Sequence, residues 1–286
     1  MKTRPFRILC DLPLVYDFLC EIYAPDNRNG VMPPFVEYAL SSSWMDASLC
    51  HRWRIWEDEG KMAAFCFTEN PRTDAYFCIR PGYEYLAVEM VAYAGEGLCK
   101  KGEDCRLVIF EAQQAVLQAA ERAGYHKAFG YTDYGYCFDR PLERALPEGY
   151  RFTAPGEMDA AKADECCWKG FNHEAEEGPW DGDFEDSLHL ATSPHATPEC
   201  SIAVVDAQGN YACYGGMWWT PRNNLAYLEP LCTVPEHRKK GLAAALLAEM
   251  ARRMGKKGAT LLTGGGDVFY QKIGFQPIHT WTFWER

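Results

Sequence analysis

Two segments of the sequence that lie 150 residues apart repeat each other. Residues 70–77 read Asn-Pro-Arg-Thr-Asp-Ala-Tyr-Phe, and residues 220–228 read Thr-Pro-Arg-Asn-Asn-Leu-Ala-Tyr-Leu, with one residue inserted. A glycine followed by an aromatic residue closes each copy, at 124–125 and again at 274–275. Repeats of this length are duplicated domains, because the units of solenoids have only ~20–45 residues. We therefore expect the 286 residues to form two similar domains.

Hydrophobic spacing predicts a similar order of helices and strands in the two halves. In the first half we expect helices over 12–23, 35–49, 83–94 and 112–123, and strands over 6–10, 51–57, 62–68, 75–79, 106–110 and 127–138. In the second half we expect helices over 158–171 and 184–191, strands over 150–153, 201–205 and 211–220, and a last strand that ends near Trp284. Residues 141–149 contain two prolines and a glycine and are predicted to link a domain over 1–140 to a domain over 150–286.

The second half contains a strand and a helix joined by a basic turn. The strand signal ends at Pro235, and the apolar residues 242, 246, 247, 250 and 254 form a helical stripe. Between them lie three cations and Gly241. The first amides of a helix have no partner within the helix, and the helix dipole adds positive charge there, so this turn is typical of an anion site. Gly241 and Ala243 carry little bulk, so a diphosphate could approach the backbone.

The turn lacks the Gly-Lys-Ser/Thr ending of a Walker loop and two of the three glycines of a dinucleotide fingerprint. Residues 238–243, Arg-Lys-Lys-Gly-Leu-Ala, instead resemble the Arg/Gln-x-x-Gly-x-Gly/Ala loop of the GNAT superfamily of N-acetyltransferases. Residues 270–275, Tyr-Gln-Lys-Ile-Gly-Phe, resemble the later Tyr-x-x-x-Gly-Phe element of the same family. This resemblance covers nearly all of the chain and implies two tandem GNAT-like α/β folds with mixed sheets.

The resemblance also implies a binding site for acetyl-CoA, the acetyl donor of the family, and no metal. The diphosphate is expected to bind mainly through backbone amides of the turn and of the first helical residues, which are Arg238, Lys239, Lys240, Gly241, Leu242, Ala243 and Ala244. Cys232, Thr233 and Val234 are expected to offer backbone groups to the pantetheine arm, because a bulge in the strand would leave them unpaired.

Transfer of an acetyl group from a thioester to an amine needs a base for the amine and an acid for the leaving thiolate. Glu229 is the candidate base, because it lies in an apolar strand where burial would raise its pKa. Otherwise it is a polar residue satisfied by a neighbour. Tyr270 is the candidate acid by resemblance, and otherwise a core aromatic residue. His173 and His237 are further candidate bases.

Two other features of the second half leave alternatives open. The glycines at 264–266 either let the backbone approach the ligand or form a flexible turn, and Asp267 is predicted to cap the helix that carries Tyr270. The loop 172–187 holds seven acidic residues and no lysine or arginine, so it either attracts a cationic amine or is a solvated mobile loop.

The first half lacks the candidate active groups. Its strand and helix are joined only by Arg80-Pro-Gly-Tyr83, Cys78 stands at the position of Glu229, and Ala120 stands at the position of Tyr270. We therefore expect the first domain to bind no coenzyme and to shape or cover the acceptor site. After Phe275 about eleven residues remain, which is enough for one strand, whereas the family that the chain resembles usually has two. Either the first half supplies the missing edge strand of the second sheet, or that sheet is one strand short.

Composition narrows the class of protein. A net charge of -11 argues against a nucleic-acid partner and suits a neutral or cationic acceptor. The thirteen cysteines are scattered without a Cys-x-x-Cys pair, which argues against zinc and disulfide frameworks. No run approaches the ~18–20 apolar residues of a membrane span, and no signal-peptide core follows the N-terminus, so a cytoplasmic location is expected.

These observations predict an acetyl-CoA-dependent N-acetyltransferase that acts on a primary amine by direct attack in a ternary complex. The acceptor could be a small molecule or a peptide amine, and it could be cationic. One alternative is a non-catalytic module that binds or senses acyl-CoA. A second alternative is a peptidyl-type transferase with an aminoacyl-tRNA donor, against which the net charge and the coenzyme-type loop argue.

Overall fold

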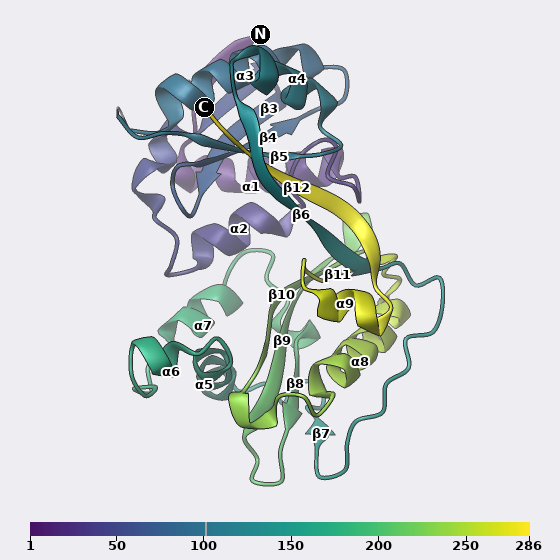
Figure 1. Cartoon of the computed structure of the whole chain (residues 1–286). Coiled ribbons are helices and arrows are strands. Elements are labelled where there is room, and N and C mark those ends of the chain that lie inside the picture. Colours follow the sequence, from purple (N-terminus) through teal and green to yellow (C-terminus); the bar gives the residue numbers. More distant parts are fainter. Residues whose placement is uncertain (101) are drawn as a thin grey trace. The chain divides into compact units, whose positions relative to one another are not determined.

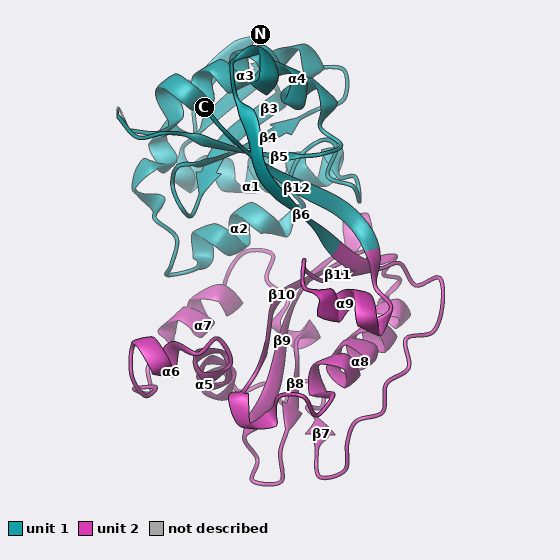
Figure 2. Ribbon diagram, in the orientation of Figure 1, with its two compact units in different colours: residues 1–133, 277–286 teal, residues 134–276 magenta. Residues whose placement is uncertain are grey.

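The computed structural model describes residues 1–100 and 102–286, and it divides the chain into two compact units (Figure 2). Unit 1 consists of Met1–Asp133 and Pro277–Arg286, and unit 2 consists of Tyr134–Gln276. This division differs from the predicted domains over 1–140 and 150–286. The C-terminal strand returns to unit 1, and the segment 141–149, predicted to be a linker, lies within unit 2.

Strand pairing explains this division. The strand β12 (Gln276–Glu285) pairs antiparallel with β5 (Arg106–Phe110), with Trp281 opposite Phe110. The strand β6 (His126–Tyr136) ends in unit 2, where Gly135 and Tyr136 pair with β11 (Leu261–Thr263). The end of β6, which belongs to the first half of the sequence, thus provides the edge strand beside β11 that the second half does not contain. The placement of β12 in unit 1 and of the end of β6 in unit 2 depends on pairing between strands that are distant in the sequence. Local sequence patterns could therefore not predict either placement.

Unit 1 is a mixed sheet with helices on it. Its strands follow the order β1-β2-β3-β4-β5-β12-β6, in which β4 and β5 pair in parallel. The remaining strands are β1 (Lys2–Pro5), β2 (Arg54–Asp58), β3 (Lys61–Glu69) and β4 (Asp74–Ile79), and the helices are α1 (Ile8–Ile22), α2 (Pro34–Ser41), α3 (Ala87–Tyr93) and α4 (Gln114–Arg122). The prediction of a strand over 6–10 is wrong, because α1 begins at Ile8 with Arg7 at its N-cap position. Of residues 6–10 only Phe6 is buried, and its ring packs against that of Trp53.

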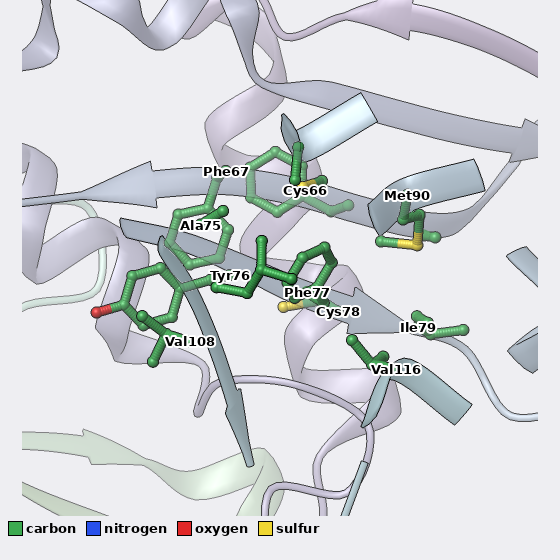
Figure 3. Close-up of a cluster of buried hydrophobic side chains, with 14 of the residues drawn as sticks. Cys66, Phe67, Ala75, Tyr76, Phe77, Cys78, Ile79, Met90, Val108 and Val116 are labelled. Carbon is green, nitrogen blue, oxygen red and sulfur yellow. The ribbon is translucent and has the colours of Figure 1, made fainter. Parts of the chain in front are cut away.

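The core of unit 1 is aromatic and centred on β3 and β4 (Figure 3). Every residue of β4 from Asp74 to Ile79 is buried, as expected for a strand that is covered on both faces. Met90 of α3 and Val116 of α4 pack against these strands. Cys78, the residue in the position of Glu229, has no exposed surface, and burial raises the pKa of its thiol to about 12.

The strands of unit 2 follow the order β6-β11-β10-β9-β8-β7, and among its described strand pairs only β10 and β11 run in parallel. Its further strands are β7 (Arg151–Phe152), β8 (Ile202–Val205), β9 (Tyr211–Thr220) and β10 (Leu225–Thr233). In Figure 1, α5 (Ala160–Gly170), α6 (His173–Glu176) and α7 (Glu185–Ala191) lie on one side of the strands, and α8 (Leu242–Lys257) and α9 (Val268–Ile273) lie on the other.

The alternation of side chains along the strands accounts for these two layers. Ile202 and Val204 of β8 pack with the α8 side of the core, whereas Ala203 and Val205 pack with α5. All five residues of the helical stripe that the sequence predicts are buried, namely Leu242, Leu246, Leu247, Met250 and Met254. The helix α8 is therefore held on the sheet along its whole length, and its N-terminus has a defined position at the end of β10.

Candidate functional site

The strand β10 contains a bulge at Glu229 and Pro230. Leu228 pairs with Met217 of β9 and Leu231 pairs with Gly215, so two residues of β10 lie opposite the single residue Gly216. A side chain at Gly216 would overlap the carbonyl oxygen of Glu229. Glycine at this position therefore allows the bulge, which interrupts the ladder and bends the strand.

Next to the bulge, β10 separates from β11. Among the described residues, the two strands pair only through Leu225 and Ala226 of β10. The next link is a hydrogen bond of 2.7 Å from the Leu228 amide to the Thr263 hydroxyl. Beyond this bond the edge of β10 that faces away from β9 has no strand beside it in the described part of unit 2, so it can accept an extended ligand.

The register decides which backbone groups of β10 face this open edge. The Val234 amide donates to the Ala212 carbonyl over 3.1 Å, so the peptide groups of Val234 and, two residues earlier, Cys232 face β9. The expectation that Val234 offers an unpaired amide is wrong, and Cys232 faces the same way. Leu231 and Thr233 face the open edge instead. Leu231 was missed because the bulge shifts the register by one residue, which the sequence alone does not reveal.

The basic turn leads from β10 into α8. Lys239 has a φ of 61° and Gly241 a φ of 84°, so the chain enters the left-handed region twice within three residues. The first backbone bond of the helix runs from the Ala245 amide to the Gly241 carbonyl over 3.0 Å, and no side chain caps the helix among the described residues. The amides of 242–244 precede that bond and lie at the positive end of the helix dipole.

There is room for an anion in front of this turn. A Cβ placed on Gly241 would meet no described atom within 4 Å. The side chains of Lys239 and Lys240 are exposed, and Leu242 is buried as the first residue of the apolar stripe. The residues therefore fit a diphosphate: unpaired backbone amides adjoin open space at Gly241, two exposed lysines lie in the turn, and no acidic side chain lies in the turn itself.

Arg238 holds the turn in place rather than projecting from it. Its guanidinium donates to the Thr233 carbonyl over 3.0 Å, to the Gly170 carbonyl over 2.8 Å and to the Asn172 side chain over 2.9 Å. The end of β10 and the end of α5 are thereby tied together at the start of the anion site. In this structure the Arg238 side chain braces the turn, and the participation of Arg238 in diphosphate binding stays a prediction.

A second set of contacts orients Lys240 and His237. The Tyr150 hydroxyl lies 2.8 Å from His237 Nδ1, and Lys240 Nζ donates to the same hydroxyl over 3.3 Å. His237 is therefore engaged with Tyr150, next to the turn rather than next to Glu229. His173, the other histidine considered as a base, lies 2.7 Å from a carboxylate oxygen of Glu177 on the surface of α6.

Glu229 lies in the bulge and is half-buried. On the α5 side of the sheet, the pKa of the Cys167 thiol is raised first by hydrogen bonding to Cys232 and then by burial, and the charge of Glu229 contributes least. The Cys232 sulfur lies 3.8 Å from the sulfurs of both Cys166 and Cys167. Cys166 and Cys167, adjacent residues of α5, pack in the core of unit 2, and all thirteen cysteines are free thiols.

Tyr270 stands over the glycines that follow β11. A Cβ on Gly264 would lie 2.6 Å from Cδ1 of the Tyr270 ring, and one on Gly265 would lie 3.2 Å from Cε2. Glycines at these positions therefore let the ring lie against the backbone, which neither of the two alternatives for the glycine run anticipated. Asp267 caps the helix by accepting a bond of 2.6 Å from the Phe269 amide, as predicted.

The two candidate catalytic residues flank the point where the strands separate. Glu229 directly follows Leu228, and the glycines beneath Tyr270 directly follow Thr263. The bond between the Leu228 amide and the Thr263 hydroxyl joins these two positions. From there the open edge of β10 runs to the basic turn, so the bulge, the open edge and the N-terminus of α8 form one continuous candidate site.

The acidic loop 172–187 is tied to α5. Trp168 donates to the Gly178 carbonyl over 2.9 Å, and Trp180 and Ser187 both donate to the carboxylate of Asp164 over 2.9 Å. Most of the acidic side chains of the loop are exposed. The loop is therefore solvated yet anchored, and whether it attracts a cationic amine stays a prediction.

The described residues show neither a metal centre nor a membrane-spanning helix. They contain no group of three or more His, Cys, Asp and Glu side chains that could hold a metal ion. Their helices are all too short or too polar to cross a membrane.

Comparisons with known proteins agree with this geometry. Residues 198–277 match a family model described as an acetyltransferase (GNAT) domain. Among curated proteins, no significant match to the sequence was found. The matched residues include the bulge, the open edge and the basic turn.

Solved structures extend the likeness to the whole chain. A GCN5-related N-acetyltransferase from Sphaerobacter thermophilus is 17% identical with a TM-score of 0.61, over 100% of this chain and 95% of that one. A tandem GNAT protein from the clavulanic acid biosynthesis pathway is 16% identical with a TM-score of 0.58, over 100% and 98%. A GNAT-family acetyltransferase from Colwellia psychrerythraea is 12% identical with a TM-score of 0.61, over 100% and 99%. Residues 198–277 thus match the model of an acetyltransferase (GNAT) domain, and the whole chain has a fold similar to that of a tandem GNAT protein.

Proposed function

We propose that unit 2 transfers an acetyl group from acetyl-CoA to the primary amine of a small molecule or peptide, by direct attack in a ternary complex. The observation that carries the proposal is the open edge of β10, which leads from a bulge to an uncapped helix N-terminus. Such an edge suits the two amide groups of a pantetheine arm, and the helix N-terminus suits a diphosphate. Acetyl-CoA would supply the thioester.

Different residues of unit 2 would bind the diphosphate and the pantetheine arm of acetyl-CoA. Amides of the turn and of residues 242–244 would hold the diphosphate, and Lys239 and Lys240 would add charge. Leu231 and the amide of Thr233 would offer backbone groups to the pantetheine arm, because they face the open edge of β10, whereas the Thr233 carbonyl accepts from Arg238. Arg238 would keep the turn in the binding conformation through its three bonds to β10 and α5.

Glu229 and Tyr270 would carry out the proton transfers. An amine of pKa ~10 is mostly protonated at neutral pH, so Glu229 would take a proton from it, directly or through water. The amine nitrogen would then form the new amide bond while the bond between the carbonyl carbon and the sulfur breaks. The Tyr270 hydroxyl would give its proton to the leaving sulfur, and the second proton that the acylated nitrogen loses would restore the Tyr270 hydroxyl. Both residues stand where β10 and β11 separate, so they flank one reaction site.

Unit 1 is proposed to bind no coenzyme. Its counterpart of Glu229 is the fully buried thiol of Cys78, and its counterpart of Tyr270 is the buried Ala120. Neither side chain can exchange a proton with a substrate at neutral pH. The cytoplasmic location and the lack of nucleic-acid and membrane partners stay predictions.

Calorimetric titration with acetyl-CoA tests the coenzyme site. The wild type is expected to bind one equivalent per chain, and Gly241→Asp is expected to abolish binding by placing a carboxylate in the anion site. Gly258→Asp is a matched control, because Gly258 at the other end of α8 also has a positive φ, 94°, and open space around its Cβ position. No binding to the wild type would refute the proposal, and two equivalents would place a second site in unit 1.

A second experiment separates the enzyme from a non-catalytic acyl-CoA sensor. A panel of primary amines is incubated with acetyl-CoA, and acetylated products are detected by mass spectrometry. Chromatographic detection of released CoA is preferable to thiol reagents, because thirteen protein thiols would react. Binding of acetyl-CoA without product from any amine would favour the sensor.

A further inference from the structure

Three cysteine side chains of unit 2 meet where α5 packs against β10. The Cys232 sulfur on β10 lies 3.8 Å from the sulfurs of both Cys166 and Cys167 on α5. The helix and the strand are in close contact there, because a Cβ placed on Gly170, the last residue of α5, would lie 2.7 Å from Cys232 Cβ. Two regular elements therefore hold the three thiols together.

The three cysteines differ in their access to solvent. Cys166 and Cys232 are 2% and 5% exposed, whereas Cys167 is only partly buried. A small solute can therefore approach the cluster from the side of Cys167. Cys166 and Cys167 are consecutive residues of a helix, and such neighbours do not face each other, so a bond between these two sulfurs is disfavoured. Cys167 and Cys232 are thus the accessible pair.

The surroundings of Cys232 favour loss of its proton. Hydrogen bonds from the thiols of Cys166 and then Cys167 hold the pKa of Cys232 well below its usual range in spite of burial, and the positive charge of Arg238 acts in the same direction. The Arg238 guanidinium is fixed close to Cys232, because it donates to the carbonyl of the next residue, Thr233. A thiolate beside a thiol is the arrangement of a reactive cysteine pair, because the thiolate is the nucleophile.

We propose that Cys167 and Cys232 are a redox-modification site, at which hydrogen peroxide closes a reversible disulfide bond. The Cys232 thiolate attacks one oxygen of the peroxide, the O–O bond breaks and hydroxide leaves, which gives a sulfenic acid. The Cys167 sulfur then attacks the Cys232 sulfur, the S–O bond breaks, and the hydroxyl group leaves as water with the Cys167 proton. The two sulfurs together lose the two electrons that the peroxide gains. A dithiol reductant reopens the bond by exchange.

The geometry allows this bond after a local movement. A disulfide bond is about 2 Å long, so the two sulfurs must approach each other by roughly 1.8 Å. Cys232 is held opposite Tyr214 of β9, and the contact at Gly170 restricts the main chain of α5. Rotation of the partly buried Cys167 side chain is therefore expected to provide most of the movement, and the remaining strain falls on β10.

This strain would act on the open edge of β10, where the residues on either side of Cys232, Leu231 and Thr233, face outward. If this edge binds the pantetheine arm, the disulfide should weaken binding of acetyl-CoA. This second part of the inference rests on the proposed function, whereas formation of the disulfide does not.

The first test maps the bond in the wild-type full chain. Reduced protein is treated with hydrogen peroxide, its free thiols are blocked with N-ethylmaleimide in denaturant, and tryptic peptides are analysed by mass spectrometry. Cys166 and Cys167 lie in peptide 163–169, and Cys232 lies in peptide 223–238. We expect these two peptides to be joined, with the blocking group on Cys166, and to separate after treatment with dithiothreitol.

Three results of this mapping would overturn the proposal. One is the absence of joined peptides, with or without further oxidation of single cysteines. A second is a blocking group on Cys167, which would assign the bond to Cys166. The third is a bond found only between Cys99 and Cys105 of unit 1, where a hydrogen bond between the two thiols lowers the pKa of Cys99.

Variants test the choice of partner. Cys167→Ser and Cys232→Ser are each expected to slow the joining of the two peptides by about tenfold or more, because the serine hydroxyl cannot form the bond. Cys166→Ser is the matched control, since its sulfur lies at the same distance from Cys232, and it is expected to react as the wild type does. Joining at the wild-type rate in Cys167→Ser would overturn the proposal.

Calorimetry with acetyl-CoA tests the effect on the coenzyme edge. The oxidised wild type is expected to bind severalfold more weakly than the reduced protein and to recover after treatment with dithiothreitol, whereas peroxide should leave the affinity of Cys167→Ser unchanged. Equal affinities of oxidised and reduced wild type would overturn this second part. A reduced protein that binds no acetyl-CoA would refute the proposed function, and the mapped disulfide would still stand.

Discussion

Substitution of Gly216 by alanine tests whether the bulge of β10 shapes the coenzyme site. The new Cβ would overlap the carbonyl oxygen of Glu229 and lie 2.7 Å from Pro230 Cδ and 2.9 Å from the carbonyl carbon of Glu229. These atoms belong to the backbone or to a proline ring, so no side chain can rotate away. The bulge would have to move as a whole, and overpacking of this kind costs about 1–3 kcal/mol.

Two measurements are needed on Gly216→Ala. Urea unfolding should show a loss of stability in that range, and calorimetry should show weaker acetyl-CoA binding, because the open edge beyond the bulge changes direction. Gly255→Ala in α8 is the control, since its Cβ would only touch the Phe138 ring at 3.3 Å and alanine favours a helix by about 0.5–1 kcal/mol. Wild-type stability and wild-type affinity in Gly216→Ala would refute the reasoning.

Three further predictions concern single side chains. Gly264→Ala would place a Cβ 2.6 Å from the Tyr270 ring, so turnover should fall while acetyl-CoA affinity, measured by calorimetry, stays near that of the wild type; parallel losses would contradict this. Glu229→Gln should lower kcat by ~10²–10⁴-fold, with little change in coenzyme affinity, if Glu229 is the base; an unchanged kcat would exclude that role. Burial raises the pKa of Glu69 to about 7, so the folded state binds the proton of this carboxyl group more tightly than the unfolded state does. The stability that Glu69 contributes is therefore fully present below about pH 4.5 and is lost as the pH rises through 7. Glu69→Gln should therefore be more stable than the wild type at pH 8 by up to about 3 kcal/mol and not at pH 4.5, as measured by urea unfolding; equal stabilities at pH 8 would contradict the assignment.

Local features of the sequence predicted the elements of the site. The apolar stripe of α8, the basic turn before it and the cap at Asp267 are all formed by residues close together in the chain. Their physical signals, helical spacing and unpaired terminal amides, act over one or two turns. The duplication could also be predicted from the sequence, because each half keeps a similar local pattern of residues.

The tertiary structure decided which groups face the site. Leu231 and Thr233 face the open edge of β10, and not Cys232 and Val234, because a bulge opposite Gly216 shifts the pairing by one residue. The glycines at 264 and 265 lie beneath a ring that is five or six residues further along the chain.

The sequence by itself thus determined the kind of fold and the residues of its candidate anion site. The tertiary structure alone decided that the last strand, β12, joins unit 1 and that Asp133 and His279 meet across 146 residues of chain. Strand partners and side-chain clusters depend on contacts between distant segments. Such contacts form only when the whole sheet is assembled, so no local pattern records them.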